Sequence, residues 1–351
     1  MHRYLMTFVA VSALTALHAA CATNSPPAIR HRASTSTAMV PAQPPAAPTG
    51  KPVATSLLGK SLFATPIPDT RRGQLEANAA IAKRGHDLNP KGEGEAILYG
   101  RRLGALCQFD RAIAVYTTAI AANPASYRLL RHRGHRYIST RRFDLALADL
   151  NKAWQLANDK SDAVEPDLDP KPDIHGVLPQ PTSTDKSNIL YHLGLTYYLK
   201  GQFDKAAETF ARRTELAARG EKLSDDSLVS FLNWHFLATM RAGHKDEAVE
   251  MLGEFRPDMN IRDNGAYFAL LRVYRGEVPA DVLAAGSETA ISSNLAMVYG
   301  VGAWKLINGD ATAAKAIFEK LAANKAWPSF GVVAAEAELA REQITSAEPQ
   351  R

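Results

Sequence analysis

Cysteine is almost absent from this sequence, which has only Cys21 and Cys107 among its 351 residues. Two thiols cannot form a disulfide framework, so the fold must be held by a packed apolar core. Long apolar stretches are scarce as well. The run from Leu5 to Leu17 is about 13 residues, and a membrane-spanning helix needs about 20. This run is therefore too short to cross a membrane.

The common motifs of catalysis are also missing. The sequence has no G-x-x-x-x-G-K-[ST], no H-E-x-x-H, no G-x-S-x-G and no C-x-x-C. His132 and His135 lie three residues apart, but no carboxylate or cysteine is placed to complete a zinc site. We therefore expect no enzymatic activity, no cofactor and no bound metal.

What the sequence does contain is a repeat with a spacing of 34 residues between Lys91 and Ala157. Gly100 and Gly134 correspond, as do Phe109 and Phe143, and a third copy keeps the same order of residues. The small residues of the three copies are Gly100, Gly134 and Gly194 in one position and Ala112, Ala146 and Ala206 in another. Small residues at these positions let two helices of a hairpin lie close together.

This pattern resembles the tetratricopeptide repeat (TPR). The resemblance implies an all-α fold, in which helical hairpins stack into a right-handed solenoid because no single hairpin can bury its apolar face. We expect an N-terminal cap helix and copies one and two at residues 71–158. Copies three to six and a closing helix should occupy 188–343, followed by a polar tail at 344–351.

The N-terminus is typical of an exported protein. Residues 1–20 have a basic start and a short apolar core, as signal peptides do, and Ala19-Ala20-Cys21 resembles the end of a bacterial lipobox. Cys21 would then be lipidated, whereas the alternative is ordinary cleavage after Ala22. Residues 21–70 are rich in Pro, Ala, Ser and Thr, and we expect them to form a disordered linker.

A proline-rich insertion at residues 159–187 separates copies two and three. It carries Pro166, Pro170, Pro172, Pro179 and Pro181 among Asp, Ser and Thr. A loop of this length is either a solvated excursion or a functional segment, and its polar composition favours the first.

The first helix of each TPR hairpin lines the concave face, and its side chains are mostly basic or aromatic in this chain. Copies one and two hold 11 Lys and Arg against 5 Asp and Glu, and guanidinium groups suit carboxylates. We therefore predict a groove for an acidic peptide or a free C-terminal carboxylate. Its expected residues are Arg101, Arg128, Arg131, His132, His135, Asn188, Tyr191, His192 and Tyr198. The alternative is a solvated basic helix.

From Asn188 onward, Phe231-Leu232-Asn233-Trp234 and Asn260-Ile261-Arg262-Asp263 resemble the NlpI-type lipoprotein adaptors of Gram-negative bacteria. That resemblance implies a non-enzymatic scaffold on the outer membrane, facing the periplasm, which binds a protease and cell-wall hydrolases. It also implies a homodimer.

The alternative location is the periplasm, as a soluble protein. The alternative function is a structural envelope lipoprotein that binds peptidoglycan or another anionic polymer through its basic repeats. Nucleic acid is not an expected partner.

Overall fold

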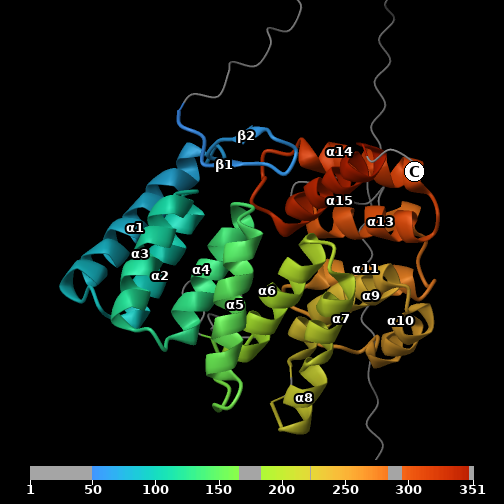
Figure 1. The fold of residues 1–351 in the computed structure, drawn as a ribbon, viewed down its shortest axis with the longest axis horizontal. Coiled ribbons are helices and arrows are strands. Elements are labelled where there is room, and N and C mark those ends of the chain that lie inside the picture. Colours follow the sequence, from blue (N-terminus) through green and yellow to red (C-terminus); the bar gives the residue numbers. More distant parts are fainter. Residues whose placement is uncertain (1–49, 166–182, 222, 284–294, 348–351) are drawn as a thin grey trace, which may run out of the picture. The chain divides into compact units, whose positions relative to one another are not determined.

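The computed structural model describes residues 50–165, 183–221, 223–283 and 295–347. These residues are mainly helical, with one small antiparallel pair of strands (Figure 1). The strands are β1 (Ala54–Thr55) and β2 (Ser61–Leu62). The helices of the first half are α1 (Asp69–Leu88), α2 (Glu93–Ala105), α3 (Phe109–Ala122), α4 (Tyr127–Ser139) and α5 (Phe143–Ala157). Those of the second half are α6 (Asp185–Leu199), α7 (Phe203–Ala211), α8 (Arg213–Ala218), α9 (Asp225–Ala242), α10 (Lys245–Met251), the 3-10 turn η1 (Leu252–Glu254), α11 (Gly265–Tyr274), α13 (Leu295–Ile307), α14 (Ala311–Ala322) and α15 (Phe330–Ala347).

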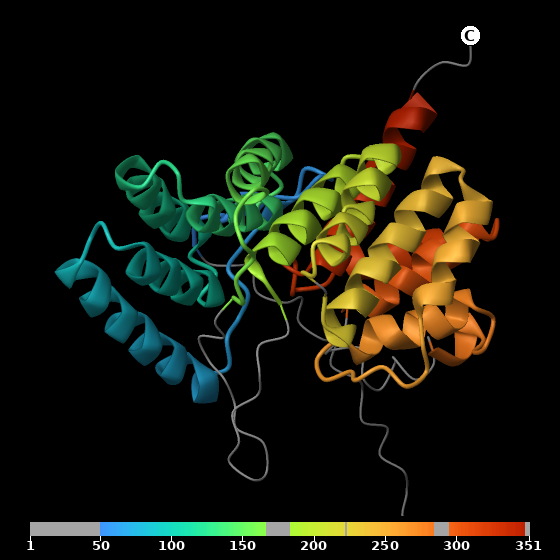
Figure 2. The same ribbon diagram turned by 90° about the horizontal axis from the view of Figure 1, so that it is seen from below.

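Neighbouring helices pack against each other along the chain, from α1 on α2 through to α14 on α15. The expected copies one and two are the hairpins α2–α3 and α4–α5, and copy three begins with α6–α7. Figure 2 shows the successive hairpins from below. The prediction of an all-α solenoid of TPR-type hairpins is confirmed.

The glycines of the repeat explain why the two helices of a hairpin can approach so closely. A methyl group added at Gly100 would lie 2.3 Å from the ring of Tyr116, and one at Gly134 would lie 2.9 Å from Leu150. Both distances are shorter than van der Waals contact allows. A side chain at either position would therefore push the paired helix away, as the spacing of the repeat predicts.

The turns between the two helices of each hairpin require one residue with a left-handed backbone conformation. Gly201, Gly243, Gly276 and Gly309 have φ between +73° and +92° there. In copies one and two the same place is taken by Cys107 (φ +58°) and Arg141 (φ +62°). In each turn the residue that follows donates its backbone N–H to the carbonyl five residues earlier, as Arg142 does to Tyr137. Cys107 is thus a helix-end residue that occupies the place of Gly201 in copy three.

The predicted linker 21–70 is wrong at its C-terminal end. Residues 53–62 form the β1–β2 hairpin, whose Val53, Leu57 and Leu62 pack against the apolar core. The backbone carbonyl of Phe63 accepts a hydrogen bond from the Trp327 indole (2.6 Å), which fixes this segment against the last repeat. The hairpin and α14–α15 lie together in Figure 1. Helix α1 then begins at Asp69.

The predicted boundary at the C-terminal end also needs correction, because α15 continues to Ala347, past the start of the expected polar tail. The signal peptide, Cys21, residues 166–182 and residues 348–351 lie outside the described residues. Within the described part of the chain, no helix is both long enough and apolar enough to span a membrane.

Candidate functional site

Helices α2, α4 and α6 each contribute polar side chains to one cluster around Glu165. The local sequence places these helices firmly. Ser126 caps α4 by accepting from the Leu129 N–H (3.1 Å), and Thr184 and Ser187 form a reciprocal capping box at the start of α6. The side chains that project from the three helices at this point are Arg101, Arg131, His132 and Asn188. We call these four residues the carboxylate box.

The carboxylate box holds the side chain of Glu165 from several sides. Arg131 forms a close ion pair with it, and Arg101 lies 3.7 Å away. The amide Nδ2 of Asn188 donates to the same carboxylate at 2.6 Å, and Nε2 of His132 lies 3.5 Å from it. Arg131, His132 and Glu165 are all at least four-fifths buried at the side chain. The cluster is therefore a largely desolvated site built for one carboxylate.

The backbone next to Glu165 is pinned to the start of α6. Glu165 donates its N–H to the Ser183 carbonyl (3.0 Å), and Asp185 donates to the Ala163 carbonyl (2.8 Å). Asp162 accepts from the Lys186 backbone at 3.0 Å, and the buried Lys186 ammonium donates to both oxygens of Glu221. The two ends of the insertion are thus ordered and cover part of the predicted groove. The expectation of a solvated excursion is wrong for Asp162, Ala163 and Glu165 and for residues 183–187, whereas residues 159–161 and Val164 are exposed. Helix α6 begins at Asp185.

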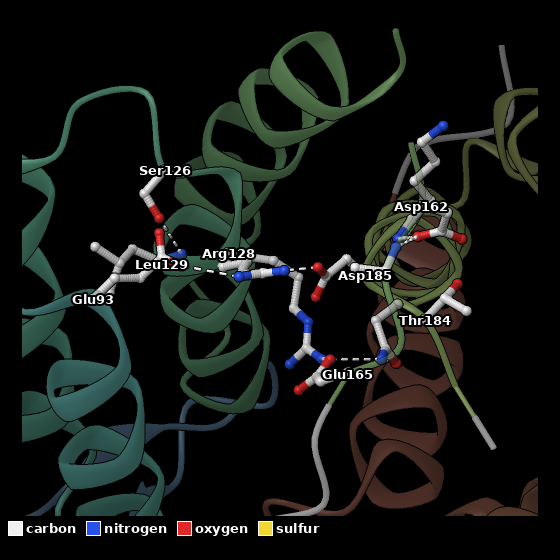
Figure 3. Close-up of polar contacts among 12 residues, drawn as sticks. Glu93, Ser126, Arg128, Leu129, Asp162, Glu165, Thr184 and Asp185 are labelled. Atoms are coloured by element: carbon white, nitrogen blue, oxygen red, sulfur yellow. Dashed lines mark hydrogen bonds and ion pairs between the residues drawn. The ribbon is translucent and has the colours of Figure 1, made fainter. Parts of the chain in front are cut away.

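Arg128 lies at the edge of this cluster, between two carboxylates (Figure 3). Its Nε donates to Asp185 at 2.7 Å and its Nη1 lies 3.4 Å from Glu93. Burial raises the pKa of Asp185, while the hydrogen bond from Arg128 opposes that rise. This arginine therefore joins α2, α4 and α6 through the chain's own acids.

Three histidines lie along the same face. The rings of His135 and His192 are 4.5 Å apart, and Phe330 of α15 packs on both. Nδ1 of His192 donates to the Asn188 carbonyl at 2.6 Å. Burial lowers the pKa of His192 to about 3 and lowers those of His132 and His135 well below the ordinary value, with the nearby arginines adding to the effect. All three are neutral at physiological pH.

Arg136 is a feature that the sequence analysis did not select. Its guanidinium lies over the Phe109 ring at 5.6 Å and covers Gly104 of α2. Within the described residues, no hydrogen bond or ion pair reaches it. Burial and the charge of Arg101 lower its pKa, and its own charge lowers the pKa values of His132, His135 and His192. The groove thus keeps a positive charge that Glu165 does not neutralise.

A cavity of about 310 Å³ continues from the carboxylate box along α6 towards α9 and α11. Its aromatic wall contains Tyr191, whose hydroxyl accepts from the Trp234 indole (2.9 Å) and lies 3.1 Å from the Tyr267 hydroxyl. The other lining residues are Ser183, Ser187, Asn188, His192, Asp226, Ser227, Ser230, Phe231, Asp263, Asn264, Tyr267 and Phe330. An extended segment that enters the box therefore has an adjoining space lined by aromatic and small polar groups.

Eight of the predicted groove residues lie in or beside this region, but Tyr198 does not. It is fully buried, packs edge-on against Trp234 and Tyr299, and accepts a hydrogen bond from the Tyr299 hydroxyl (2.8 Å). The placement of Tyr198 in the groove is therefore wrong. Its position on α6 faces a later repeat, which a single-hairpin pattern does not reveal.

Three contributors to the site were missed: Glu165, Arg136 and Phe330. The acidity of the insertion could have suggested Glu165, but nothing in its spacing pointed to the basic face. Phe330 reaches the site only because α15 also contacts α6. No group of three or more His, Cys, Asp or Glu that could hold a metal occurs in the described part of the chain.

Comparison with known proteins finds one family model and several solved structures. The family model of the tetratricopeptide repeat matches residues 187–218, and no curated protein matches the chain. Among solved structures, MamA is 17% identical over 53% of this chain and 84% of its own (TM-score 0.37). YrrB, described as a TPR protein with an unusual peptide-binding site, is 13% identical over 76% of this chain and 99% of its own (TM-score 0.38). The Naa15/Naa10 complex bound to HypK is 13% identical over 80% of this chain and 40% of its own (TM-score 0.33). One repeat of this chain thus matches the tetratricopeptide-repeat model directly, and the neighbouring hairpins are built in the same way.

Proposed function

We propose that this protein is a non-enzymatic scaffold that binds an extended acidic segment of a partner protein. The segment would lie along α2, α4 and α6 and place a carboxylate in the box of Arg101, Arg131, His132 and Asn188. Partner residues next to that carboxylate would enter the cavity beside Tyr191 and Tyr267. The partner would carry either an acidic side chain or a free C-terminal carboxylate.

The observation that carries this proposal is the Glu165 carboxylate itself. Four side chains from three helices converge on it, and the surroundings are mostly closed to water. Charge-assisted hydrogen bonds of this kind are stronger than neutral ones, and a planar guanidinium can meet both oxygens of a carboxylate. The site thus has the chemistry to recognise a carboxylate specifically.

Binding of an anionic polymer through a solvated basic helix has less support. Of the six arginines between residues 128 and 142, five make ion pairs within the chain: Arg128, Arg131, Arg133, Arg141 and Arg142. Polymer binding depends on many exposed charges and on the release of counterions. Since most of these charges are already paired, a discrete peptide ligand is favoured over a polymer.

We also propose that the scaffold is exported and tethered by a lipid on Cys21 to the outer membrane, facing the periplasm. The support is the lipobox-like Ala19-Ala20-Cys21 and the resemblance to NlpI-type adaptors. A tether would concentrate the groove near the membrane, where envelope proteases and wall hydrolases act. Incorporation of labelled fatty acid into the wild type but not into Cys21→Ser tests this part separately.

The test of the groove is a selection of peptides from a random library on the immobilised full-length protein. Two variants lose the same charge: Arg131→Gln inside the box and Arg142→Gln outside it, where Arg142 pairs with the exposed Asp110. We expect acidic sequences to be enriched on the wild type and on Arg142→Gln, and to be lost on Arg131→Gln. Equal enrichment on all three proteins, or none on the wild type, would refute the groove.

A further inference from the structure

We propose that Glu165 is a built-in competitor for the groove, and that the partner segment displaces it by presenting two carboxylates. This inference rests on the proposed function and goes beyond it in two ways. First, the chain's own Val164-Glu165 indicates where the ligand lies in the groove. Second, Arg136 binds the second carboxylate of the ligand.

The arrangement around Glu165 lets its side chain exchange without unfolding anything. The segment is held by backbone hydrogen bonds of Ala163 and Glu165 with Asp185 and Ser183, and by the Asp162 side chain, which accepts from the Lys186 N–H. The contacts with the carboxylate box are made by the Glu165 side chain alone. A rotation of that side chain would free the box, while the pinned backbone stays in place. Val164 is already half exposed beside it.

A ligand with a single carboxylate gains little by this exchange, because it makes the same contacts as Glu165 and loses its freedom of movement on binding. Glu165 is tethered to the site and has a high effective concentration there, of millimolar order. A successful partner therefore needs a contact that Glu165 cannot make.

Arg136 can provide that contact. It follows Arg131 by five residues on α4, which corresponds to about 7.5 Å along the helix axis and about 140° around it, and its side chain lies against Gly104 of α2. Its charge lowers the pKa values of Arg131, His132 and His192, so it lies within electrostatic reach of the carboxylate box. Within the described residues no acid pairs with it, and it is partly shielded from water by Phe109 and Gly104. A second carboxylate on the partner, one residue or one chain terminus away from the first, would neutralise it. The kind of partner that fits is thus an extended segment with two neighbouring carboxylates, as at a C-terminal Glu.

The experiment uses a fluorescent peptide with the sequence of residues 159–165, which ends at Glu165 with a free carboxyl group. Its last residue carries a side-chain carboxylate and an α-carboxylate. The same peptide with an amidated C-terminus lacks the second charge. Binding to the full-length protein is measured by fluorescence anisotropy for the wild type, Glu165→Gln, and Glu165→Gln combined with Arg131→Gln or Arg136→Gln. Glu319→Gln, a change of the same charge at an exposed site on α14, is the matched control.

We expect Glu165→Gln to bind the free-acid peptide at least about tenfold more tightly than the wild type. A competitor that occupies the site nine-tenths of the time weakens apparent affinity by that factor. In the Glu165→Gln background, Arg131→Gln should weaken both peptides about tenfold or more. Arg136→Gln should weaken the free-acid peptide about tenfold but leave the amidated peptide unchanged.

The outcomes separate the two levels of the proposal. Equal affinity of wild type and Glu165→Gln, with Arg131 still required, overturns the competitor and leaves the groove standing. An equal effect of Arg136→Gln on both peptides overturns the second carboxylate site. Tightening of the same size in Glu319→Gln also overturns the competitor, and binding that does not depend on Arg131 overturns the groove as well. Circular dichroism checks the fold of each variant, and Glu165→Asp, which keeps the charge but shortens the reach, should give an intermediate affinity if Glu165→Gln does not fold.

Discussion

Two of the buried glutamate–arginine pairs in the described part of the chain look alike locally and differ in what surrounds them. Glu336 on α15 meets Arg141 through two hydrogen bonds (2.7 and 3.0 Å), and both side chains are at least 97% buried. Glu165 meets Arg131 from the end of a loop, where its side chain keeps 13% of its exposure. The first pair joins the turn of copy two to the closing helix, and the second closes a groove.

The difference lies in how many other groups hold each glutamate. Glu336 also accepts the Leu57 N–H of the β1–β2 hairpin (3.2 Å), and Arg141 donates to the Trp327 carbonyl (2.9 Å) while stacking on its ring. Three separate segments therefore move if that pair opens. Opening the Glu165 pair requires only a side-chain rotation beside a cavity. A buried ion pair can thus serve as a permanent fastening in one place and as an exchangeable contact in another.

Loss of Glu336 should have the largest effect. Glu336→Ala leaves the Arg141 guanidinium buried without a counterion, which costs about 3–5 kcal/mol. Glu342→Ala on the same helix removes a surface pair with Lys315, in which both partners are half exposed, and should cost less than about 1 kcal/mol. Urea denaturation followed by circular dichroism gives both values. A cost for Glu336→Ala no larger than that for Glu342→Ala would contradict the fastening role.

The next largest effect concerns pH, because acid should lower the stability of the groove region at a higher pH than that of the closing-helix region. The folded-state pKa values of His132, His135 and His192 lie below the unfolded value of about 6.5. At any pH between the folded and unfolded pKa values, the unfolded chain binds more protons than the folded one. The free energy of unfolding therefore falls as the pH drops below about 6.5. Each histidine should account for about 1–2 kcal/mol of loss between pH 7.5 and pH 5. Near the closing helix, burial raises the pKa of Glu338, but Arg341 and Arg241 together outweigh burial and lower it below its ordinary value, so its contribution is lost only below about pH 4.5.

His135→Phe tests the histidine part of this difference. The phenyl ring can keep the contacts with His192 and Phe330, and the imidazole ring of His135 makes no hydrogen bond with the described residues. We expect the stability lost between pH 7.5 and pH 5, measured by urea denaturation, to shrink by about 1–2 kcal/mol in this variant. An unchanged pH dependence would mean that His135 does not resist protonation in the folded protein.

Glu165→Ala should destabilise the fold less than Glu336→Ala, by about 1–2 kcal/mol, because water can reach Arg131 through the groove once the side chain is gone. A dicarboxylate such as succinate should then raise the melting temperature of Glu165→Ala more than that of the wild type, since it binds only the open groove. Glu336→Ala should show no such rescue. If succinate stabilises all three proteins equally, the contrast between the two pairs is lost.

The sequence was a good guide where a contact repeats along the solenoid and a poor one where it does not. Gly100 and Gly134 are set by packing within a hairpin, so the 34-residue period reveals them. Arg131 was placed on the concave face by its position in α4. Glu165 and Tyr198 depend on segments far away in the chain, and no local period encodes such contacts. The apolar residues Val53, Leu57 and Leu62 of the hairpin were hidden by the proline-rich composition around them.

The smallest effect expected here concerns the turns that both regions share. Cys107 stands in the left-handed conformation where later copies have glycine, so Cys107→Gly should stabilise the fold by about 0.5–1 kcal/mol. Gly243→Ala makes the reverse change where a methyl group would meet no atom within 4 Å, and it should cost about 1 kcal/mol through backbone strain alone. Thermal denaturation of the two variants measures both. Arg141 has the same conformation, yet Arg141→Gly should destabilise, because the ion pair with Glu336 outweighs the relief of strain. If Arg141→Gly were more stable than the wild type, the strain of the left-handed conformation at Arg141 would exceed the stabilisation by its ion pair with Glu336. The contrast between Glu336 and Glu165 would then fail.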